Sequence, residues 1–354
     1  MKALILAGGT GSRLRPITYS MAKQLVPVAN KPVIEYGIEA IAAAGVKEFG
    51  IIVGDTGPAV EKAVGDGSKW GIKITYIPQS APLGLAHAVL TALPFLGDDD
   101  FVMYLGDNLI KSSVNTLVEE FKQHRPAATI LLTPVPNPSD FGVAELENNR
   151  VSRLQEKPKD PKSNLALVGV YLFDRRIHDS IAVLKPSPRG EYEITDAIQG
   201  LIDTNLEVRS HIVEGWWKDT GTVDAMLEAN RLILEDIEPT NAGSADDVSR
   251  IEGRVQVGEG TVIQNSVIRG PAVIGANCRI VDSFVGPFTA LADNTKLDST
   301  EIENSIVMGD CELVHAPSRL ANCLIGRGAS IKRASGTPRT MQLVLGDSSS
   351  VVLP

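Results

Sequence analysis

The chain has few cysteines and histidines and no long hydrophobic run. Its 354 residues include only three cysteines (Cys278, Cys311 and Cys323) and five histidines. The cysteines are odd in number, widely spaced and without histidines at metal-ligand intervals, so we interpret them as reduced core residues. The N-terminal apolar stretch, residues 3–7, is too short for a signal peptide, and nothing approaches the roughly 20 apolar residues of a membrane span. These absences predict a cytoplasmic protein with no membrane partner.

Positive charge is also scarce. The chain has 34 Lys and Arg against 43 Asp and Glu, a formal net charge of −9. This balance argues against a nucleic-acid or anionic-membrane surface, because either would need a basic patch to offset phosphate charge. The length suggests about two domains, and 43% hydrophobic residues are enough for a sizeable core.

Two common phosphate-binding motifs are missing from the glycine-rich segment near the N-terminus. A dinucleotide fingerprint needs a third glycine where Leu14 stands, and a P-loop needs a Gly-Lys pair, which the chain lacks. What is present is an apolar run followed by Gly8, Gly9 and Gly11, with two cations beyond them: Arg13 and Lys23. A tight turn of this kind directs backbone N–H groups at phosphates, and the cations suit a nucleoside triphosphate. The alternative is an ordinary turn with Arg13 in solvent.

The first two-thirds of the chain alternates short apolar runs with amphipathic stretches. This pattern predicts an α/β domain with a Rossmann-like, mostly parallel sheet, which we place at residues 1–236. The helices include residues 33–44, 85–93 and 223–235, and the strands are expected at residues 2–7, 49–53, 72–77, 101–105, 129–133, 167–173 and 208–213. In such sheets ligands bind beyond the carboxyl ends of the strands.

A second, repetitive domain follows a Pro-, Gly- and Asp-containing linker at residues 237–250. Aliphatic residues then recur every six positions, with one slip: Val262, Ile268, Ile274 and Ile280, then Val285, Leu291 and Leu297. This period is typical of a parallel β-helix in which each repeat stacks an aliphatic side chain inward, and we place it at residues 251–346. The repeat is imperfect over residues 298–322. Residues 347–354 form a tail.

Two aspartates stand where a divalent metal would be held during phosphate chemistry. Asp107 follows a buried strand after Gly106, and Asp219 precedes a helix. Mg²⁺ usually takes one or two protein carboxylates and fills its shell with water and substrate phosphates. Each aspartate alone is more often a turn residue or a helix cap. Their combination with the glycine-rich turn favours a magnesium site.

Six ordered motifs resemble those of the sugar-1-phosphate nucleotidylyltransferases over the N-terminal two-thirds of the chain. They are Leu6-Ala7-Gly8-Gly9-x-Gly11-x-Arg13-Leu14-x-Pro16, Lys23-Gln24-Leu25-x-Pro27, Leu105-Gly106-Asp107-Asn108, Glu156-Lys157-Pro158, Ser187-Pro188-Arg189-Gly190-Glu191 and Asp219-Thr220-Gly221. Within the family the chain is similar to the branch that joins dTTP to glucose 1-phosphate for deoxysugar synthesis. Its long form carries a C-terminal left-handed β-helix.

The resemblance implies Mg²⁺-dependent attack of the sugar phosphate on the α-phosphorus of dTTP, without a nucleophilic side chain, in a homo-oligomer. It assigns Arg13, Lys23, Asp107, Lys157 and Asp219 to catalysis, with the metal on Asp107 and Asp219. The nucleotide would contact Gly8, Gly11, Arg13, Lys23, Gln24, Gln79 and Gly84. The sugar phosphate would contact Asn108, Gly142, Glu156, Lys157, Val168, Arg189 and Trp217.

Two departures and three alternatives accompany the resemblance. Leu83 stands where shorter members carry aspartate. Phe141 stands where they carry tyrosine, and the missing hydroxyl leaves the choice of hexose less defined. A UTP-using uridylyltransferase is the nearest alternative, disfavoured by Gln24, where such relatives usually carry an acid. A non-catalytic regulatory protein should have lost Arg13 or an aspartate. A hexapeptide acyltransferase would need a catalytic histidine on the β-helix, where His315 is the candidate.

Overall fold

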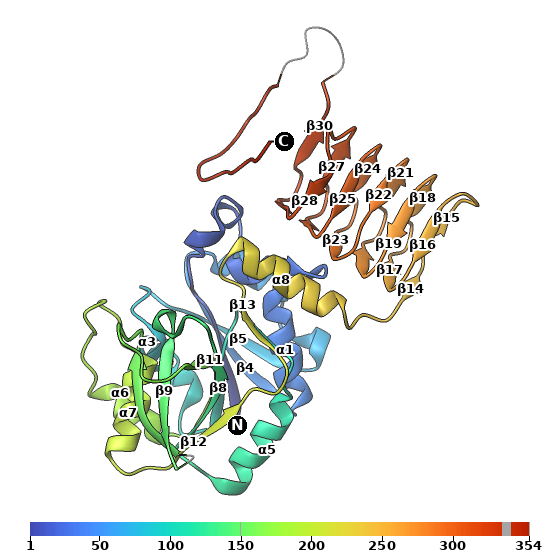
Figure 1. Cartoon of the computed structure of the whole chain (residues 1–354). Helices are drawn as coiled ribbons and strands as arrows, with labels where there is room; N and C mark the ends of the chain where they lie inside the picture. The colour runs from blue at the N-terminus through green and yellow to red at the C-terminus, as the bar shows by residue number, and fades with distance from the viewer. Residues whose placement is uncertain (149, 335–340, 354) are drawn as a thin grey trace. The chain divides into compact units, whose positions relative to one another are not determined.

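A computed structural model describes residues 1–148, 150–334 and 341–353, and the chain divides into two compact units (Figure 1). The first unit comprises Met1–Thr10, Met21–Leu25 and Val33–Asp219. The second comprises Gly11–Ser20, Val26–Pro32 and the chain from Thr220 onward. Residues 335–340 of the predicted β-helix and residue 354 of the predicted tail lie outside the described residues. Within the described part, no helix has the length and apolar character needed to cross a membrane.

A nine-stranded sheet forms the centre of the first unit. Its strands lie in the order β10-β9-β11-β6-β1-β4-β5, with β8 beside β11 and β12 beside β8. The bounds are β1 (Lys2–Ala7), β4 (Glu48–Val53), β5 (Lys73–Pro78), β6 (Phe101–Leu105), β8 (Ala128–Pro134), β9 (Gly142–Glu147), β10 (Arg150–Glu156), β11 (Leu165–Phe173) and β12 (Val208–Ile212). All seven predicted strands are present with ends within two residues. The predicted parallel order holds for β6-β1-β4-β5, whereas β11 runs antiparallel to β6 and β8.

Hydrophobic clusters cover both faces of this sheet. Successive residues of β1 alternate between them: Leu4 and Leu6 belong to one cluster, and Ala3, Ile5 and Ala7 belong to the other. Burial on both faces explains why the strand reads as a continuous apolar run. The helices of this unit are α1 (Val33–Ala43), α2 (Gly57–Val64), α3 (Leu85–Thr91), α4 (Leu93–Leu96), α5 (Val114–His124), α6 (Arg176–Ala182) and α7 (Ile194–Asp203).

Two short pairs of strands also lie outside the β-helix. Strands β7 (Asn108–Ile110) and β13 (Trp217–Asp219) pair antiparallel, and so do β2 (Pro27–Val28) and β3 (Lys31–Pro32). The sequence pattern predicted neither pair, because strands of two or three residues are too short to show a period.

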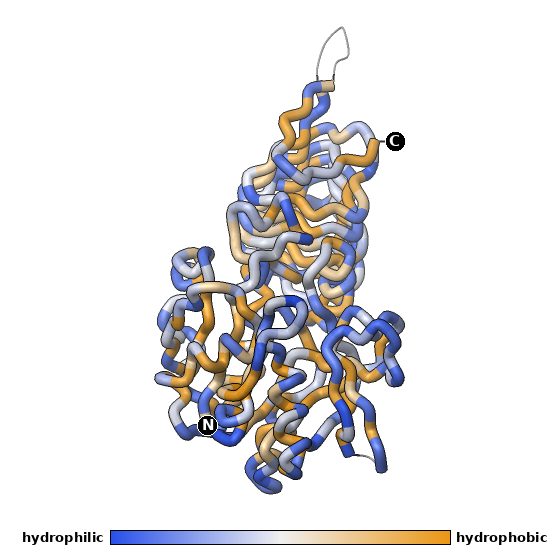
Figure 2. The backbone as a smooth tube through the Cα atoms, turned by 90° about the vertical axis from the view of Figure 1, so that its left-hand side faces the viewer, coloured by the Kyte–Doolittle hydropathy of each residue, from blue (hydrophilic) through white to orange (hydrophobic). Residues whose placement is uncertain are grey.

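The C-terminal region is a stack of three parallel sheets, as the β-helix prediction requires (Figure 1). The first sheet contains β14 (Thr240–Asn241), β17 (Val255–Val257), β20 (Ala272–Ile274), β23 (Thr289–Leu291), β26 (Ile306–Val307) and β29 (Leu324–Ile325). The second contains β15 (Ser244–Ala245), β18 (Val262–Gln264), β21 (Arg279–Val281), β24 (Lys296–Asp298), β27 (Glu312–Val314) and β30 (Ser330–Lys332). The third contains β16 (Arg250–Glu252), β19 (Val267–Arg269), β22 (Phe284–Val285), β25 (Glu301–Glu303) and β28 (Leu320–Ala321). The hydropathy colouring alternates along these coils (Figure 2).

The coil length explains the slip in the six-residue pattern. Ile263 pairs with Ile280, and Ile280 pairs with Leu297, so one full coil takes 17 positions (263 to 280, then 280 to 297). Two sides of the coil therefore advance by six residues and the third by five. The prediction that Val262 stacks inward was wrong: its side chain is 36% exposed, and Ile263 is the buried neighbour. The imperfect stretch at residues 298–322 still forms coils, because β25, β27 and β28 all pair in register.

Cysteines line the β-helix interior without pairing. Cys278 and Cys311 are buried and Cys323 is half-buried, and all three are free thiols. Burial raises the pKa of each thiol, which keeps the sulfur protonated and unreactive.

The second unit also contains chain from near the N-terminus. The buried amide of Asn230, on α8 (Val223–Leu234), accepts a hydrogen bond from Ala29 N–H at 2.8 Å and donates one to Phe288 O at 2.9 Å. The Asn30 side chain donates to Leu291 O at 2.6 Å. The β2–β3 hairpin is therefore fixed to α8 and to the coils, a connection across 200 residues that no local pattern indicates.

Candidate active site

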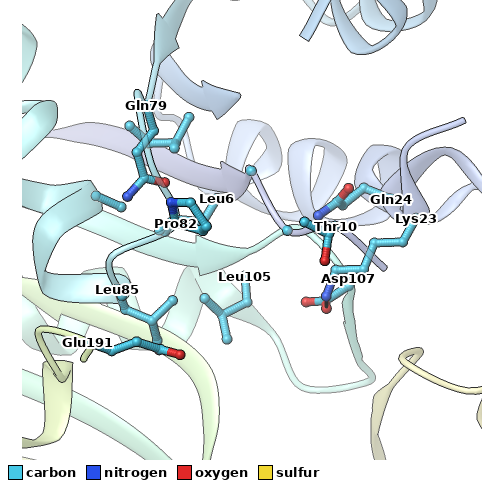
Figure 3. Close-up of a pocket in the computed structure, with 15 residues that line it drawn as sticks. Leu6, Thr10, Lys23, Gln24, Gln79, Pro82, Leu85, Leu105, Asp107 and Glu191 are labelled. Atoms are coloured by element: carbon cyan, nitrogen blue, oxygen red, sulfur yellow. Dashed lines mark hydrogen bonds and ion pairs between the residues drawn. The ribbon is translucent and has the colours of Figure 1, made fainter. Parts of the chain in front are cut away.

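A pocket of about 420 Å³ opens at the end of β1, in the first unit (Figure 3). The buried strand ends at Ala7, and Gly8, Gly9 and Thr10 form the wall beyond it. A Cβ on Gly8 would come within 3.2 Å of the Gln79 side-chain oxygen, and one on Gly9 within 3.0 Å of Lys23 Cε. The two glycines therefore keep space that a side chain would fill, as expected of a loop that approaches a ligand closely.

An ion pair stands on one side of this pocket. Lys23 contacts the Asp107 carboxylate through Nζ, and both side chains are largely buried. Asp107 reaches this place because β6 delivers Gly106 and Asp107 just past its carboxyl end. Gln24 lies on the same side, and its buried Oε1 has no hydrogen-bond partner (Figure 3). A cation and a carboxylate in contact at the end of parallel strands form an arrangement suited to phosphate and metal binding.

The β7–β13 pair places Asp219 beside this centre. Asp219 lies directly opposite Asn108, the neighbour of Asp107. Asn108 is held by three groups: Trp217 Nε1 donates to its Oδ1 at 2.8 Å, Tyr104 OH donates to its carbonyl at 3.0 Å, and its Nδ2 lies 3.5 Å from Asp107 Oδ1. Burial and the nearby Asp107 charge raise the pKa of Tyr104, so this hydroxyl stays a donor.

The two aspartates are a chemically suitable pair for Mg²⁺. Asp219 ends β13, and Asp107 immediately precedes the partner strand β7; a site built on these two carboxylates would take its remaining ligands from water and substrate phosphates. Among the described residues no group of three or more His, Cys, Asp or Glu side chains is arranged to hold a metal ion. A metal here would therefore depend on the substrate for part of its coordination.

A second pocket, of about 740 Å³, is lined by Glu156, Lys157 and Arg189. Lys157 is held at the turn after β10, where its N–H donates to Phe141 O at 3.0 Å. Arg189 contacts three carboxylates at 3.1–3.2 Å: Glu156, Glu191 and Glu193. The Arg189 side chain is 39% exposed and its partner Glu193 only 5%, so the charges are paired at the edge of the pocket with access to water. A guanidinium and an ammonium in one pocket match a phosphate dianion.

The environment of Glu156 raises the pKa of its carboxyl. Burial raises its pKa, and the charge of Glu193 raises it further, while Lys157, Arg189 and the Thr195 hydroxyl act in the opposite direction. Thr195 Oγ1 donates to Glu156 Oε2 at 3.3 Å. A Cβ on Gly142 would lie 3.1 Å from the same carboxylate. Gly142 therefore leaves room beside a carboxylate that could accept hydrogen bonds from a sugar.

The two pockets are connected through the segment between Arg189 and Glu193. Tyr192 N–H donates to Leu83 O at 2.7 Å, and Ala86 N–H donates to Tyr192 O at 3.1 Å. Gly84, at φ 102°, passes so close that a Cβ would lie 2.5 Å from Tyr192 O. Glu191 lines the first pocket while it contacts Arg189 in the second. Only glycine fits this crossing, because both the positive φ and the close approach exclude a side chain.

Most predicted site residues thus lie in or beside the two pockets, and four differ in their placement. Val168 is fully buried in the hydrophobic core, at an irregularity in β11, so its side chain has no exposed surface. Arg13, on the 3-10 helix Ser12–Leu14, and Gly11, at φ 63°, belong to the second unit. Trp217 lies edge-on to Phe141 with ring centroids 5.5 Å apart.

Sequence reasoning missed three polar residues near the pockets. Glu191 ends the Ser187-to-Glu191 motif and Glu193 lies two residues beyond it, so their position was available, but their contacts with Arg189 depend on the loop geometry. His87 had no sequence signal, because it is one polar residue on a short helix.

These features suit an enzyme that handles two phosphate-bearing substrates in adjoining pockets, one of them at the carboxyl end of parallel strands. The chain belongs to the nucleotidyl transferase family, whose model matches residues 2–236. It is 55% identical, over 353 residues and 99% of both chains, to a glucose-1-phosphate thymidylyltransferase of Streptomyces antibioticus. It is 46% identical, over the full length of both chains, to the low-salt glycan biosynthesis nucleotidyltransferase Agl11 of Haloferax volcanii.

A solved structure shares the fold of the N-terminal part. It is a UDP-glucose pyrophosphorylase complexed with UDP-glucose, 26% identical, with a TM-score of 0.61 over 67% of this chain and 99% of that chain.

Proposed function

We propose that the chain is a glucose-1-phosphate thymidylyltransferase, which converts dTTP and α-D-glucose 1-phosphate into dTDP-glucose and pyrophosphate with Mg²⁺. The observation that carries the proposal is the Lys23–Asp107 pair beside the glycine wall of one pocket, adjoining the Arg189 and Lys157 pocket. The full-length similarity to a named thymidylyltransferase supports the choice of substrates.

The reaction brings two anions together, so catalysis rests on alignment and charge neutralisation. An oxygen of the sugar phosphate attacks the α-phosphorus of the nucleotide. The bond from that phosphorus to the oxygen shared with the β-phosphorus breaks, and pyrophosphate leaves with the bonding electrons. No proton needs to move to or from a side chain.

The chain's own residues supply the binding groups for this step. Lys23 exchanges its contact with Asp107 for a phosphate oxygen of dTTP, and Arg13 is assigned to the same triphosphate. The backbone at Gly8 and Gly11 is assigned to close approach of the triphosphate. Gln24, Gln79 and Gly84 are assigned to the pyrimidine base.

In the second pocket, Arg189 and Lys157 hold the sugar phosphate. Arg189 does so by exchanging carboxylate partners for phosphate oxygens. Glu156 accepts hydrogen bonds from the sugar. The same sugar phosphate is contacted by Gly142, Asn108, Trp217 and the backbone at Val168. Asp107 and Asp219 would hold Mg²⁺, which when bound neutralises charge on the reacting phosphates.

We also propose that the enzyme works in the cytoplasm as a homo-oligomer and in deoxysugar synthesis. The support for these points is the resemblance of the chain to the long form of the family, including its β-helix. The acidic net charge argues against a partner with a phosphate-rich surface.

The test is pyrophosphate release with glucose 1-phosphate and Mg²⁺, using dTTP, UTP, ATP, CTP and GTP in parallel, with chromatography of the nucleotide product. We expect dTTP to be preferred and dTDP-glucose to form. Preference for UTP would keep the mechanism and replace the base assignment. No turnover with any nucleotide would contradict the proposal and favour a non-catalytic member of the family.

A further inference from the structure

One hydrogen bond joins the Gln79 amide to His87 at the edge of the first pocket. Gln79 follows the end of β5, and its backbone N–H donates to Val53 O at 2.9 Å, so the residue is held in place. Its side-chain Nε2 lies 2.8 Å from His87 Nδ1. Its Oε1 points the other way, toward Gly8, where a Cβ would come within 3.2 Å of it (Figure 3).

The chemistry of the two groups defines the proton positions. An amide nitrogen only donates, so the His87 Nδ1 that receives this bond must be the unprotonated, accepting nitrogen. The neutral ring then carries its proton on Nε2. The Gln79 oxygen, with lone pairs and no proton, is the end presented to the pocket.

The ring of His87 is itself held in place. His87 lies on α3, which begins immediately after Gly84. Its ring stacks near Tyr192, with centroids 6.3 Å apart and an interplanar angle of 28°. The backbone of Tyr192 is hydrogen-bonded on both sides, to Leu83 and Ala86. The imidazole therefore has a fixed surface on one side and the Gln79 amide on the other.

We propose that His87 is a positioning residue that sets base selectivity, by holding Gln79 with its carbonyl oxygen toward the nucleotide. That oxygen accepts a hydrogen bond from the N3–H of thymine or uracil. Cytosine has a lone pair at N3, so the same oxygen repels it. This inference rests on the proposed function, because it assumes that a nucleoside triphosphate base lies against Gln79.

The consequence is a selectivity controlled by a residue that does not touch the base. A donor-only side chain at position 87 turns the Gln79 amide around and presents Nε2, which suits cytosine. An acceptor-only side chain at the same position keeps the original orientation. A site that hydrogen-bonds a group of its substrate strongly rejects an analogue that lacks this group. Discrimination against an analogue that lacks only a methyl group is far weaker.

The experiment uses dTTP and 5-methyl-dCTP, which differ only at N3 and C4 of the base. The readouts are the ratio of their kcat/KM values with glucose 1-phosphate and the ratio of their affinities from thermal-shift titration. We expect His87→Lys to lower both ratios at least tenfold, and His87→Glu to keep them within about threefold. His87→Arg is a second donor-only variant in case His87→Lys does not fold, and circular dichroism checks each protein.

The outcomes separate the inference from the proposed function. A wild-type enzyme that prefers 5-methyl-dCTP, or that binds neither pyrimidine, overturns the base assignment and the inference together. A wild-type enzyme that prefers dTTP, with equal losses for both nucleotides in the Lys and Glu variants, shows that His87 only packs and overturns the inference alone. Loss of selectivity in the donor variants but not in the Glu variant supports it.

Discussion

The two units handle buried polar groups in opposite ways. In the first unit, charged side chains pair where strands end: Asp107 meets Lys23 with both largely buried, and the half-buried Glu156 meets the more exposed Arg189. In the β-helix the buried polar residues are hydroxyls such as Ser266, Ser283 and Thr300, each bonded to the backbone of its own or the next coil. Its charges lie outside.

The difference shows what a repeated structure excludes. Each coil stacks on a nearly identical coil, so a buried charge would need a partner at a position that the repeat fills with aliphatic residues. The sheet of the first unit has strand ends with no such neighbour, and there charged groups keep partial access to water and ligands. Both pockets lie in the aperiodic unit, and the β-helix carries none of their lining residues.

The largest expected effect tests the charged centre. Asp107→Asn keeps the shape of the side chain but removes the charge that faces Lys23 and would hold the metal. We expect turnover to fall roughly a hundredfold or more, with the fold unchanged. Pyrophosphate release and circular dichroism measure this. Asp98→Asn, at an exposed aspartate, is the control; near-normal activity of Asp107→Asn would remove Asp107 from the metal site.

The next effect tests the stacking of the β-helix. Ile280 is fully buried, and Val262, which the six-residue pattern predicted to be inside, is 36% exposed. We expect Ile280→Ala to cost about 2–5 kcal/mol of unfolding free energy. Val262→Ala should cost much less. Denaturant titration measures the unfolding free energy of both variants. Equal losses of unfolding free energy would contradict the coil register.

A smaller effect tests the connection of the N-terminal hairpin to the second unit. Asn230→Ala leaves Ala29 N–H and Phe288 C=O without their partner, and we expect a loss of about 1–3 kcal/mol. Hydrogen exchange at residues 27–32 should speed up together with exchange in α8. If the hairpin kept its protection, the amide bridge would not be what fixes it.

The smallest effect concerns pH. The Glu193 charge is the second cause that raises the pKa of Glu156, after burial. Glu193→Gln removes that charge, so the pKa of Glu156 falls and the carboxylate stays ionised at lower pH. The acidic limb of kcat/KM for glucose 1-phosphate should move to lower pH. Both enzymes use the same substrate, so the ratio of the variant's kcat/KM to that of the wild type at each pH cancels the effect of substrate titration.

Glu207→Gln, at an exposed carboxylate paired with Arg209, is the matched control for this experiment. Its pH profile should overlay that of the wild type. An unmoved profile in Glu193→Gln would show that Glu156 does not need its charge to bind the sugar.

Much of the fold was predictable because its signals are local. Strand β1 was predicted with its observed ends, since a run of apolar residues stopped by glycine has one reasonable interpretation. The β-helix was predicted from its period, but the inward phase was misplaced at Val262. A five-residue side within a 17-residue coil breaks a strict six-residue count.

The site was predictable in its components more than in its arrangement. The motifs named Lys23, Asp107, Glu156 and Arg189, and the structure brings them to two adjoining pockets. The pairing of Arg189 with three carboxylates was not foreseen, because it depends on how the loop before α7 folds.

The sequence by itself determined the class of fold, the periodic second half and the chemical groups available for phosphate binding. These follow from hydrophobic period, glycine placement and residue type, all of which act over a few neighbouring positions. Only the tertiary structure decided that residues 11–20 and 26–32 belong with the C-terminal unit, that Asp219 lies opposite Asn108, and that His87 orients Gln79. Each of these depends on contacts between segments distant in the chain or on one side-chain orientation, which the packed fold alone determines.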